Sequence, residues 1–314
     1  MKALITGIAG QDGYHLAEYL LSQNYHVIGI DIRPTYDAPG KIEYYSGSIT
    51  DGDFLCDLII KTKPDAIFNL ASISQVSKCY DLPIETFTTN LLPAIRILEL
   101  IRRQLPKTRF LQAASSDMFG GGSSRPFNEG SPIDPMSIYA VSKASAYHCV
   151  RIYRNVYNIF ACNAILFNHT SPRHSPDFVI AKIVKGLVAI KLGKEAKLQV
   201  GNLDIERDWG YAGDYAIAMA KIIQHDGADD YVVGTGWRIS LKAILEYVLK
   251  ALDLNYNEVI EVNPEYFRPN DPKVIYSDPA KIKRKLGWAP SLSIEKVLDK
   301  MLENEMIKQR SANE

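Results

Sequence analysis

The first half of the chain alternates short apolar runs with longer segments of mixed apolar and polar residues. Short apolar runs bounded by polar residues are typical of buried strands, whereas the longer segments have the spacing of amphipathic helices. Strands that alternate with helices of ten to twenty residues indicate an α/β fold with a doubly wound parallel sheet. The pattern predicts strands at 2–6, 26–30, 66–70, 109–114 and 162–167, and helices at 14–23, 54–61, 84–104 and from about 137.

The alternation ends after Asn168, and helix and strand segments then follow without regular spacing. A stretch rich in proline, serine and charge at 169–177 predicts a loop, as do two arginine-bearing stretches at 201–213 and 266–272. The residues from 294 to about 310 predict a terminal helix. We therefore expect a first domain at 1–168 and a smaller C-terminal lobe at 169–314, with some chain crossing between them.

The composition is that of an ordinary globular protein, with 46% hydrophobic and 23% charged residues among 314. Lysine plus arginine and aspartate plus glutamate both number 36, and a net charge of zero argues against nucleic acid as a partner. No run of 18 apolar residues and no cleavable signal is present, so we expect no membrane partner and a cytoplasmic location. The cysteines and histidines have no metal-ligand spacing, so we expect reduced thiols and no metal site.

Three glycines, Gly7, Gly10 and Gly13, separate the first predicted strand from the first predicted helix, with Gln11 and Asp12 between the last two. Glycines in this position let the backbone approach a pyrophosphate closely, and the N-terminus of the following helix presents free N–H groups to it. Because the three glycines lie between a strand and a helix, they indicate a dinucleotide site more strongly than the spacing alone would.

Asp31 ends the second predicted strand, about twenty residues after this turn. A carboxylate there accepts hydrogen bonds from the adenosine ribose and repels a 2′-phosphate, which favours NAD over NADP. Arg33 lies two residues further on and is able to pair with a phosphate, so NADP stays open as the alternative cofactor.

Tyr139 and Lys143 lie four residues apart on a predicted helix and therefore share one face. A neighbouring ammonium favours the phenolate, so we expect the pKa of Tyr139 to fall from about 10 toward neutrality. Such a phenol is able to exchange a proton with an alcohol or ketone during hydride transfer. Ser115 and Asp117 follow a buried strand and are expected at the same cleft, Ser115 on the substrate oxygen and Asp117 as a second acid/base.

These motifs resemble the extended short-chain dehydrogenase/reductase family that acts on nucleotide sugars, and within it the GDP-mannose 4,6-dehydratase branch. The glycine turn with its Gln11–Asp12 pair is similar to the opening of that branch. Four further stretches continue the likeness over almost the whole chain, at 165–173, 201–215, 267–269 and 285–290.

The resemblance implies an extended Rossmann fold, in which 1–168 binds NAD or NADP and 169–314 mainly binds the nucleotide sugar. It implies that His169 helps to bind the cofactor and that Lys143 also holds the nicotinamide ribose. It further implies a homodimer built on a helix pair that includes the Tyr139 helix. The residues implied to line the GDP-sugar site are Asn168, Lys182, Arg207 and Arg268.

The chain departs from the branch at three places. Asp117 stands where the family has a glutamate base, and Ser115 stands where it has a threonine. Around Asp31 the branch has paired arginines that suit NADP and that in some members help to build a tetramer, whereas only Arg33 is present here. The last departure puts NADP use and a tetramer in doubt.

The resemblance implies a nucleotide-sugar 4,6-dehydratase that acts on a GDP-manno sugar and forms a 4-keto-6-deoxy product through transient oxidation at C4. A 4-ketoreductase or 4-dehydrogenase on the same sugars stays open, because it needs Ser115, Tyr139 and Lys143 but no second base. A 4-epimerase shares the same three residues. A non-catalytic NAD-sensing protein is the alternative of a different class, and an intact set of these residues argues against it.

Overall fold

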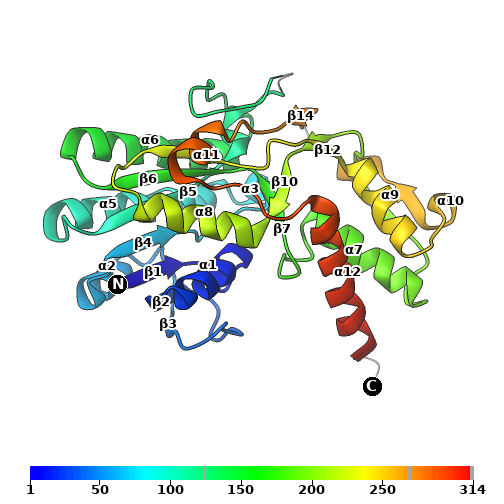
Figure 1. Cartoon of the computed structure of the whole chain (residues 1–314), viewed down its shortest axis with the longest axis horizontal. Helices are drawn as coiled ribbons and strands as arrows, with labels where there is room; N and C mark the ends of the chain where they lie inside the picture. Colours follow the sequence, from blue (N-terminus) through cyan, green and yellow to red (C-terminus); the bar gives the residue numbers. More distant parts are fainter. Residues whose placement is uncertain (123–124, 268–270, 312–314) are drawn as a thin grey trace.

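Seven strands form one parallel sheet at the centre of the computed structural model, which describes residues 1–122, 125–267 and 271–311 (Figure 1). Each neighbouring pair of these strands runs parallel, and Leu4 lies opposite Ile28 on one side and Ile67 on the other. In sheet order the strands are β11 (Asp230–Val233), β6 (Ala161–Leu166), β5 (Arg109–Ser115), β4 (Ala66–Asn69), β1 (Lys2–Thr6), β2 (His26–Asp31) and β3 (Glu43–Ser46).

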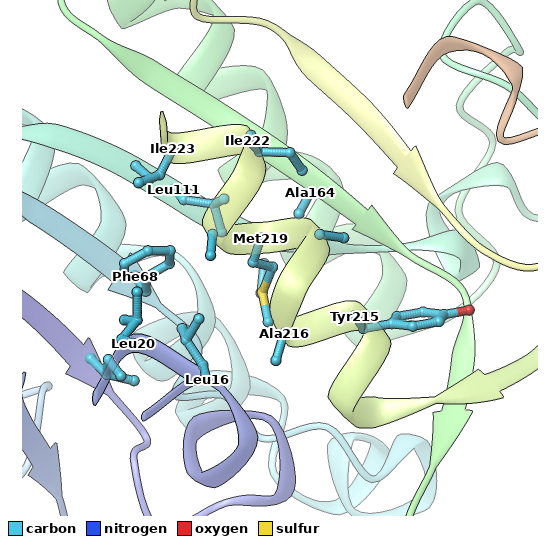
Figure 2. Close-up of a cluster of buried hydrophobic side chains, with 14 of the residues drawn as sticks. Leu16, Leu20, Phe68, Leu111, Ala164, Tyr215, Ala216, Met219, Ile222 and Ile223 are labelled. Atoms are coloured by element: carbon cyan, nitrogen blue, oxygen red, sulfur yellow. The ribbon is translucent and has the colours of Figure 1, made fainter. Parts of the chain in front are cut away.

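Helices cover both faces of the sheet, as expected for a parallel sheet whose strands are apolar on both sides. Figure 2 shows α8 laid along the sheet, with Met219 facing Phe68 and Leu111. Tyr215, in the first turn of α8, belongs to the same buried cluster but lies farther from these two residues. The helices on this face are α1 (Gln11–Ser22), α8 (Ala212–Gln224) and α11 (Ala280–Leu286), and those on the other face are α2 (Gly52–Thr62), α5 (Leu92–Gln104) and α6 (Ile138–Tyr157).

The predicted helix at 84–104 is wrong as one element, because the chain forms two helices there. α4 (Pro83–Asn90) stops at Leu91, and α5 restarts at Leu92 with Pro93 in its first turn. Proline has no N–H to donate and its ring clashes with a preceding helical turn, so a helix tolerates it only at the start. A short helix, α3 (Val76–Asp81), precedes this pair.

A second hydrophobic core lies beyond the carboxyl ends of the strands, and its helices gather on one side of Figure 1. Apolar residues of three helices fill it, including Leu187, Ile244 and Leu298. Its elements are α7 (Val179–Lys191), α9 (Leu241–Ala251), α10 (Tyr256–Val259), α12 (Ile294–Ser311) and the paired strands β8 (Leu198–Val200) and β13 (Ile260–Val262). The predicted terminal helix from 294 is confirmed as α12.

Short strands replace part of the loops predicted after residue 168. Asn168–Thr170 forms β7 and pairs with β10 (Trp209–Tyr211), and α8 begins at once at Ala212. A small sheet joins β9 (Glu206–Arg207), β12 (Ile239–Ser240) and β14 (Val274–Ile275), and two short 3₁₀ helices are η1 (Ser116–Phe119) and η2 (Pro264–Tyr266). The chain returns to the central sheet through α8 and β11, so residues beyond 168 contribute to both cores.

Candidate active site

The turn between β1 and α1 has the form expected of a phosphate cradle. The Gly10 N–H donates to the Gly7 carbonyl oxygen at 3.0 Å, and α1 begins with the next residue. A Cβ built on Gly13 would collide with the Gly7 carbonyl, whereas one on Gly10 would meet only that oxygen, at 3.2 Å, among the described atoms within 4 Å. Gly10 lines the large cavity described below, so a side chain there would fill space that a phosphate needs.

Asp31 and Arg33 hold the other side of this turn. One Asp31 carboxylate oxygen accepts the Ala9 N–H at 3.1 Å, and the other accepts the Arg33 N–H at 3.2 Å. The Arg33 guanidinium donates back to the Ala9 carbonyl. Asp31 therefore lies at the end of β2 beside the glycine turn, where the ribose of a dinucleotide would meet it, and Arg33 lies next to it on the cavity wall.

Asp12 and His169 form an ion pair on the wall of the cavity. His169 Nε2 lies 2.9 Å from Asp12 Oδ1, and His169 Nδ1 lies 2.7 Å from the Phe167 carbonyl oxygen. Burial alone would lower the pKa of His169, but the charge and hydrogen bond of Asp12 raise it overall. The same pair lowers the pKa of Asp12 to about 2, against the opposing effect of burial. Both ring nitrogens of His169 face acceptor oxygens, so the protonated ring is the form that donates to both, in line with the raised pKa.

Tyr139 and Lys143 lie one turn apart near the start of α6. Ser137 caps this helix, with its hydroxyl accepting the Ala140 N–H at 3.1 Å. The Lys143 ammonium donates to the Ala113 carbonyl of β5 at 3.0 Å and lies 5.8 Å from the centre of the Tyr139 ring. Burial lowers the pKa of Lys143 to about 8. The predicted pairing of the two residues on one helix face is therefore present in the structure.

The expectation that Lys143 lowers the pKa of Tyr139 is wrong for the protein alone. Burial raises the pKa of Tyr139 well above its usual value, and the Asp117 charge adds to that effect. A hydrogen bond with Ser115 acts in the opposite direction but does not overcome them. The sequence shows that an ammonium lies nearby, but it does not show how deeply the phenol is buried, and burial dominates here.

Ser115 and Asp117 lie at the carboxyl end of β5, facing the same cavity as Tyr139. Ser115 is the last residue of the strand, and its hydroxyl accepts the Asp117 N–H at 3.2 Å. This bond fixes the first turn of η1 and sets the backbone of Asp117 relative to the catalytic candidates. The strand end thus brings together the hydroxyl, the carboxylate and the phenol that the sequence singled out.

Three of the four residues implied to bind the nucleotide sugar line the cavity, and Arg268 lies outside the described residues. Arg207, on β9, lies 2.6 Å from the Asp271 carboxylate and is buried. The Lys182 ammonium, on α7, lies 4.2 Å from the centre of the Tyr266 ring. The Asn168 side-chain oxygen is buried and has no hydrogen-bond partner among the described residues, so it is an acceptor whose bonding capacity is unused.

Gly10, Asp31, Ser115, Tyr139 and Lys182 line one cavity of about 1880 Å³, which lies between the sheet and the second core. Sites for one small molecule usually measure about 300–1,000 Å³, so this cavity has room for two ligands side by side. The glycine turn lies on the wall of this cavity formed by β1 and α1, and Lys182 lies on the wall formed by α7.

One supporting residue has no clear signal in the sequence. Asn90, at the end of α4, accepts the Ile73 N–H at 2.9 Å and donates to the Ile73 carbonyl and the Ser142 hydroxyl. It thereby ties the cavity-lining loop after β4 to α6. In the sequence, the one hint is that Asn90 is a polar residue directly before the apolar pair Leu91–Leu92.

Neither a membrane-spanning helix nor a metal-binding cluster of side chains occurs in the described ranges. Within residues 1–122, 125–267 and 271–311, no helix has the length and apolar character needed to cross a bilayer. In the same ranges, histidine, cysteine and carboxylate side chains do not gather in groups of three that would suit a metal ion.

The chain is similar to known proteins over almost its whole length. Residues 4–301 match the family model described as GDP-mannose 4,6 dehydratase. A GDP-mannose 4,6-dehydratase of Vibrio cholerae is 35% identical, over 99% of this chain and 95% of the relative.

Two solved structures share the fold at lower identity. DesIV, a dTDP-glucose 4,6-dehydratase of Streptomyces venezuelae with NAD and TYD bound, superposes with a TM-score of 0.88 at 23% identity, covering 99% of this chain and 98% of that one. RMD of Pseudomonas aeruginosa, complexed with NADPH, gives 0.84 at 24% identity, covering 98% and 99%. Together with the family match, the extended Rossmann architecture and the assembled site, these likenesses show that this chain belongs to the GDP-mannose 4,6-dehydratase family of the extended short-chain dehydrogenases/reductases.

Proposed function

We propose that this enzyme removes water from a GDP-manno sugar, either a hexose or a heptose, and releases its 4-keto-6-deoxy derivative. The observation that carries the proposal is the arrangement at the end of β5. Ser115, Asp117 and Tyr139 line one cavity together with the glycine turn, so a sugar and a dinucleotide fit there in contact. The family membership supports the guanosine diphosphate and the sugar.

Each polar residue then has a distinct task. Tyr139 takes the proton of the C4 hydroxyl while Ser115 donates a hydrogen bond to the same oxygen. When bound, a nicotinamide dinucleotide would accept and later give back one hydride, and its positive charge would favour the Tyr139 phenolate. The ketone formed at C4 makes the C5 proton acidic. Asp117 removes that proton and delivers it to the C6 hydroxyl, which leaves as water. As C6 gains the hydride, C5 regains a proton from solvent and Tyr139 releases the C4 proton to solvent, so the turnover sums to the loss of one water.

The proposed cofactor is NAD, with NADP as the alternative. The hydrogen bonds from Ala9 and Arg33 fix the position of the Asp31 carboxylate beside the ribose position, where a carboxylate disfavours a 2′-phosphate. Arg33 is more than half exposed and is the group that would accommodate such a phosphate. Titration of the purified protein with NAD and NADP decides between them, and tighter binding of NADP would contradict the assignment.

The test of the proposed reaction is incubation with GDP-mannose and with GDP-manno-heptose. A dehydratase yields a product lighter by one water with no net accumulation of reduced cofactor. Reduced cofactor formed in proportion to product would instead show a 4-dehydrogenase. If the enzyme binds cofactor but leaves a range of nucleotide sugars unchanged, the proposal is wrong and a sensor role gains support.

The 4-ketoreductase or 4-dehydrogenase remains the second candidate because of one residue. Asp117 is one methylene shorter than the family's glutamate base, which lengthens the path from its carboxylate to C5. Without that proton transfer, the reaction would stop after C4 oxidation. A 4-epimerase uses the same three residues and would be recognised by an unchanged product mass with altered configuration at C4.

The remaining proposals concern assembly and location. We propose a homodimer through the helix pair that includes α6, whose outer face exposes Ile152, Val156 and Tyr157. A single monomer mass at micromolar concentration in light scattering would refute the dimer. We also place the enzyme in the cytoplasm, which fits its four unpaired cysteines.

A further inference from the structure

The segment 168–174, which we name the strap, crosses from the sheet to the second core directly over the start of α1. Alternate residues of the strap contact the first turns of that helix. His169 pairs with Asp12 at 2.9 Å, and the Ser171 hydroxyl donates to the Gln11 side-chain oxygen at 2.9 Å. The strap is thus attached to the residues that follow the phosphate turn, although far from them in sequence.

Arg173 makes the third contact with α1 and also binds a second segment, the loop between β2 and β3. Its guanidinium lies 3.3 Å from the centre of the Tyr14 ring, a cation–π contact. The same guanidinium lies 2.7 Å from the Asp37 carboxylate, in the loop between β2 and β3. Arg173 therefore bridges α1 and the loop that follows β2.

These contacts close a ring around one end of the cavity. The loop after β2 is bound to the glycine turn through Asp31 and Arg33, which contact Ala9. The glycine turn continues into α1, which is bound to the strap, and the strap returns to the loop through Arg173 and Asp37. The residues of this ring that line the cavity are Ala9, Asp12, Asp31, Arg33, Asp37, His169 and Arg173.

The ion pairs that hold the two ends of the strap differ in burial and therefore in strength. The His169 pair is largely buried, and its ring also packs on Tyr215 with centres 4.4 Å apart. The Arg173 pair is exposed, with 35% of the arginine side chain and 83% of Asp37 accessible. Exposed ion pairs contribute little and break readily, whereas buried pairs persist. The strap therefore has a fixed end at His169 and an end at Arg173 that is able to open.

We propose that the strap retains the dinucleotide in the enzyme from one turnover to the next, with Arg173 as the residue that opens for loading and release. The inference rests on the proposed function, which places a nicotinamide dinucleotide in this end of the cavity. A dehydratase returns the hydride to its own product and has no need to exchange the cofactor. A dehydrogenase must exchange it in every cycle, so a closed ring suits the first reaction and hinders the second.

The experiment measures cofactor release directly. The purified enzyme is loaded with radiolabelled NAD and chased with excess unlabelled NAD, and the label that stays on the protein is followed by filtration. We expect Arg173→Met to release the label about tenfold faster than the parent, since it loses both the cation–π contact and the ion pair. Ser171→Ala should release it faster by a smaller factor, and its loss of one hydroxyl leaves little risk of misfolding.

The matched control is Arg103→Met, which also removes an exposed arginine pair, with Glu99 at 2.8 Å on α5, but lies away from the cavity. It should release NAD at the parent rate. Equal release rates in the parent, both strap variants and this control would overturn the proposal, as would a parent that retains no label.

The proposed dehydration reaction and the proposed retention of NAD by the strap can be refuted independently of each other. If the parent retains NAD and the strap variants lose it, but GDP-mannose is not dehydrated, the proposed reaction is wrong and retention stands. If GDP-mannose is dehydrated and the strap variants release NAD no faster than the parent, only retention is wrong.

Discussion

The Lys143 ammonium lies 3.0 Å from the Ala113 carbonyl oxygen, which belongs to the strand and not to the helix that carries the lysine. The bond fixes the end of a long side chain against β5, directly below Tyr139 on the same helix. A carbonyl accepts but does not donate, so the contact favours the ammonium over the neutral amine. Burial acts in the opposite direction and lowers the pKa of Lys143 to about 8.

Turnover should therefore fall as the pH rises through about 8, because Lys143 is charged below its pKa and neutral above it. The measurement is kcat against pH with saturating GDP-mannose and NAD. Lys143→Met should lower kcat by about 10²–10⁴-fold and abolish this descending limb. A limb that persists unchanged in the variant would show that another group titrates there.

Asp117→Asn should prevent water loss but leave C4 oxidation partly intact, because the amide cannot accept the C5 proton. Reduced cofactor should then build up in place of dehydrated product, which absorbance and product mass record together. Asp117→Glu is the matched control, since it restores the family's longer carboxylate and should keep dehydration. Equal survival of both half-reactions in Asp117→Asn would remove this residue from the mechanism.

Ser115→Ala should reduce kcat by about 10²-fold or more, with a smaller change in KM. The reason is that its hydroxyl, which hydrogen-bonds Tyr139, is expected to stabilise charge that develops on the C4 oxygen. Ser115→Thr keeps the hydroxyl and should retain most activity. Loss of activity in both variants would point to packing at the end of β5 instead of hydrogen bonding.

The parts of the fold predicted from the sequence are those in which one local signal dominates. Apolar runs located β1, β2, β4, β5 and β6, and Ser137 marked the start of α6. They missed β3, the edge strand Glu43–Ser46, whose residues are polar or aromatic and not fully buried. The boundary near Leu91 was missed because the apolar pattern continues through it while Pro93 interrupts the backbone. In the second half, short strands such as β9 and β10 depend on partners distant in sequence, and two or three residues give no periodicity to read.

The candidate site also contains some residues that the local sequence locates and some contacts that depend on the whole fold. The sequence locates the glycine turn, Asp31 and the Tyr139–Lys143 pair because each lies within or beside a single predicted strand or helix. The spacing along that element then sets the relative positions of the residues. The link from Asp12 to His169 depends on how the chain returns over α1, and the local sequence contains no record of that path. The raised pKa of Tyr139 was missed for a related reason, because burial is a property of the whole fold.

Removing the charge of Asp12 should lower the pKa of His169. In the parent protein that pKa is raised by Asp12 and should lie above the usual 6.5, whereas in Asp12→Asn burial should bring it below 6.5. The histidine proton signals in NMR report both values. An unchanged titration would show that the carbonyl of Phe167, and not Asp12, holds the charge.

The Asp12–His169 ion pair stabilises the fold within a limited range of pH. The contribution of Asp12 is present above its usual pKa of 3.8 and is lost as the pH falls through about 2, while that of His169 is lost as the pH rises through its raised pKa. The stability difference between the parent and Asp12→Asn should therefore be largest between these limits.

Met219→Ala should lower the free energy of unfolding by about 2–5 kcal/mol, because the side chain is fully buried between α8 and the sheet (Figure 2). Urea denaturation followed by circular dichroism measures the change. Ile307→Ala, on the exposed side of α12, is the control and should alter stability by no more than about 0.5 kcal/mol. A similar loss in both variants would contradict the placement of Met219.

The last strand of the central sheet, β11, comes about 60 residues after β6, the strand that it pairs with, and α7, β8 and α8 lie between them in the chain. Until residue 233 has left the ribosome, β6 is an open edge with unpaired backbone groups. A fragment ending at 168 would keep that edge permanently and, lacking α8, would also expose the apolar face that this helix covers. Residues 1–168 are thus unsuited to independent expression, and the central sheet is complete only when β11 has emerged.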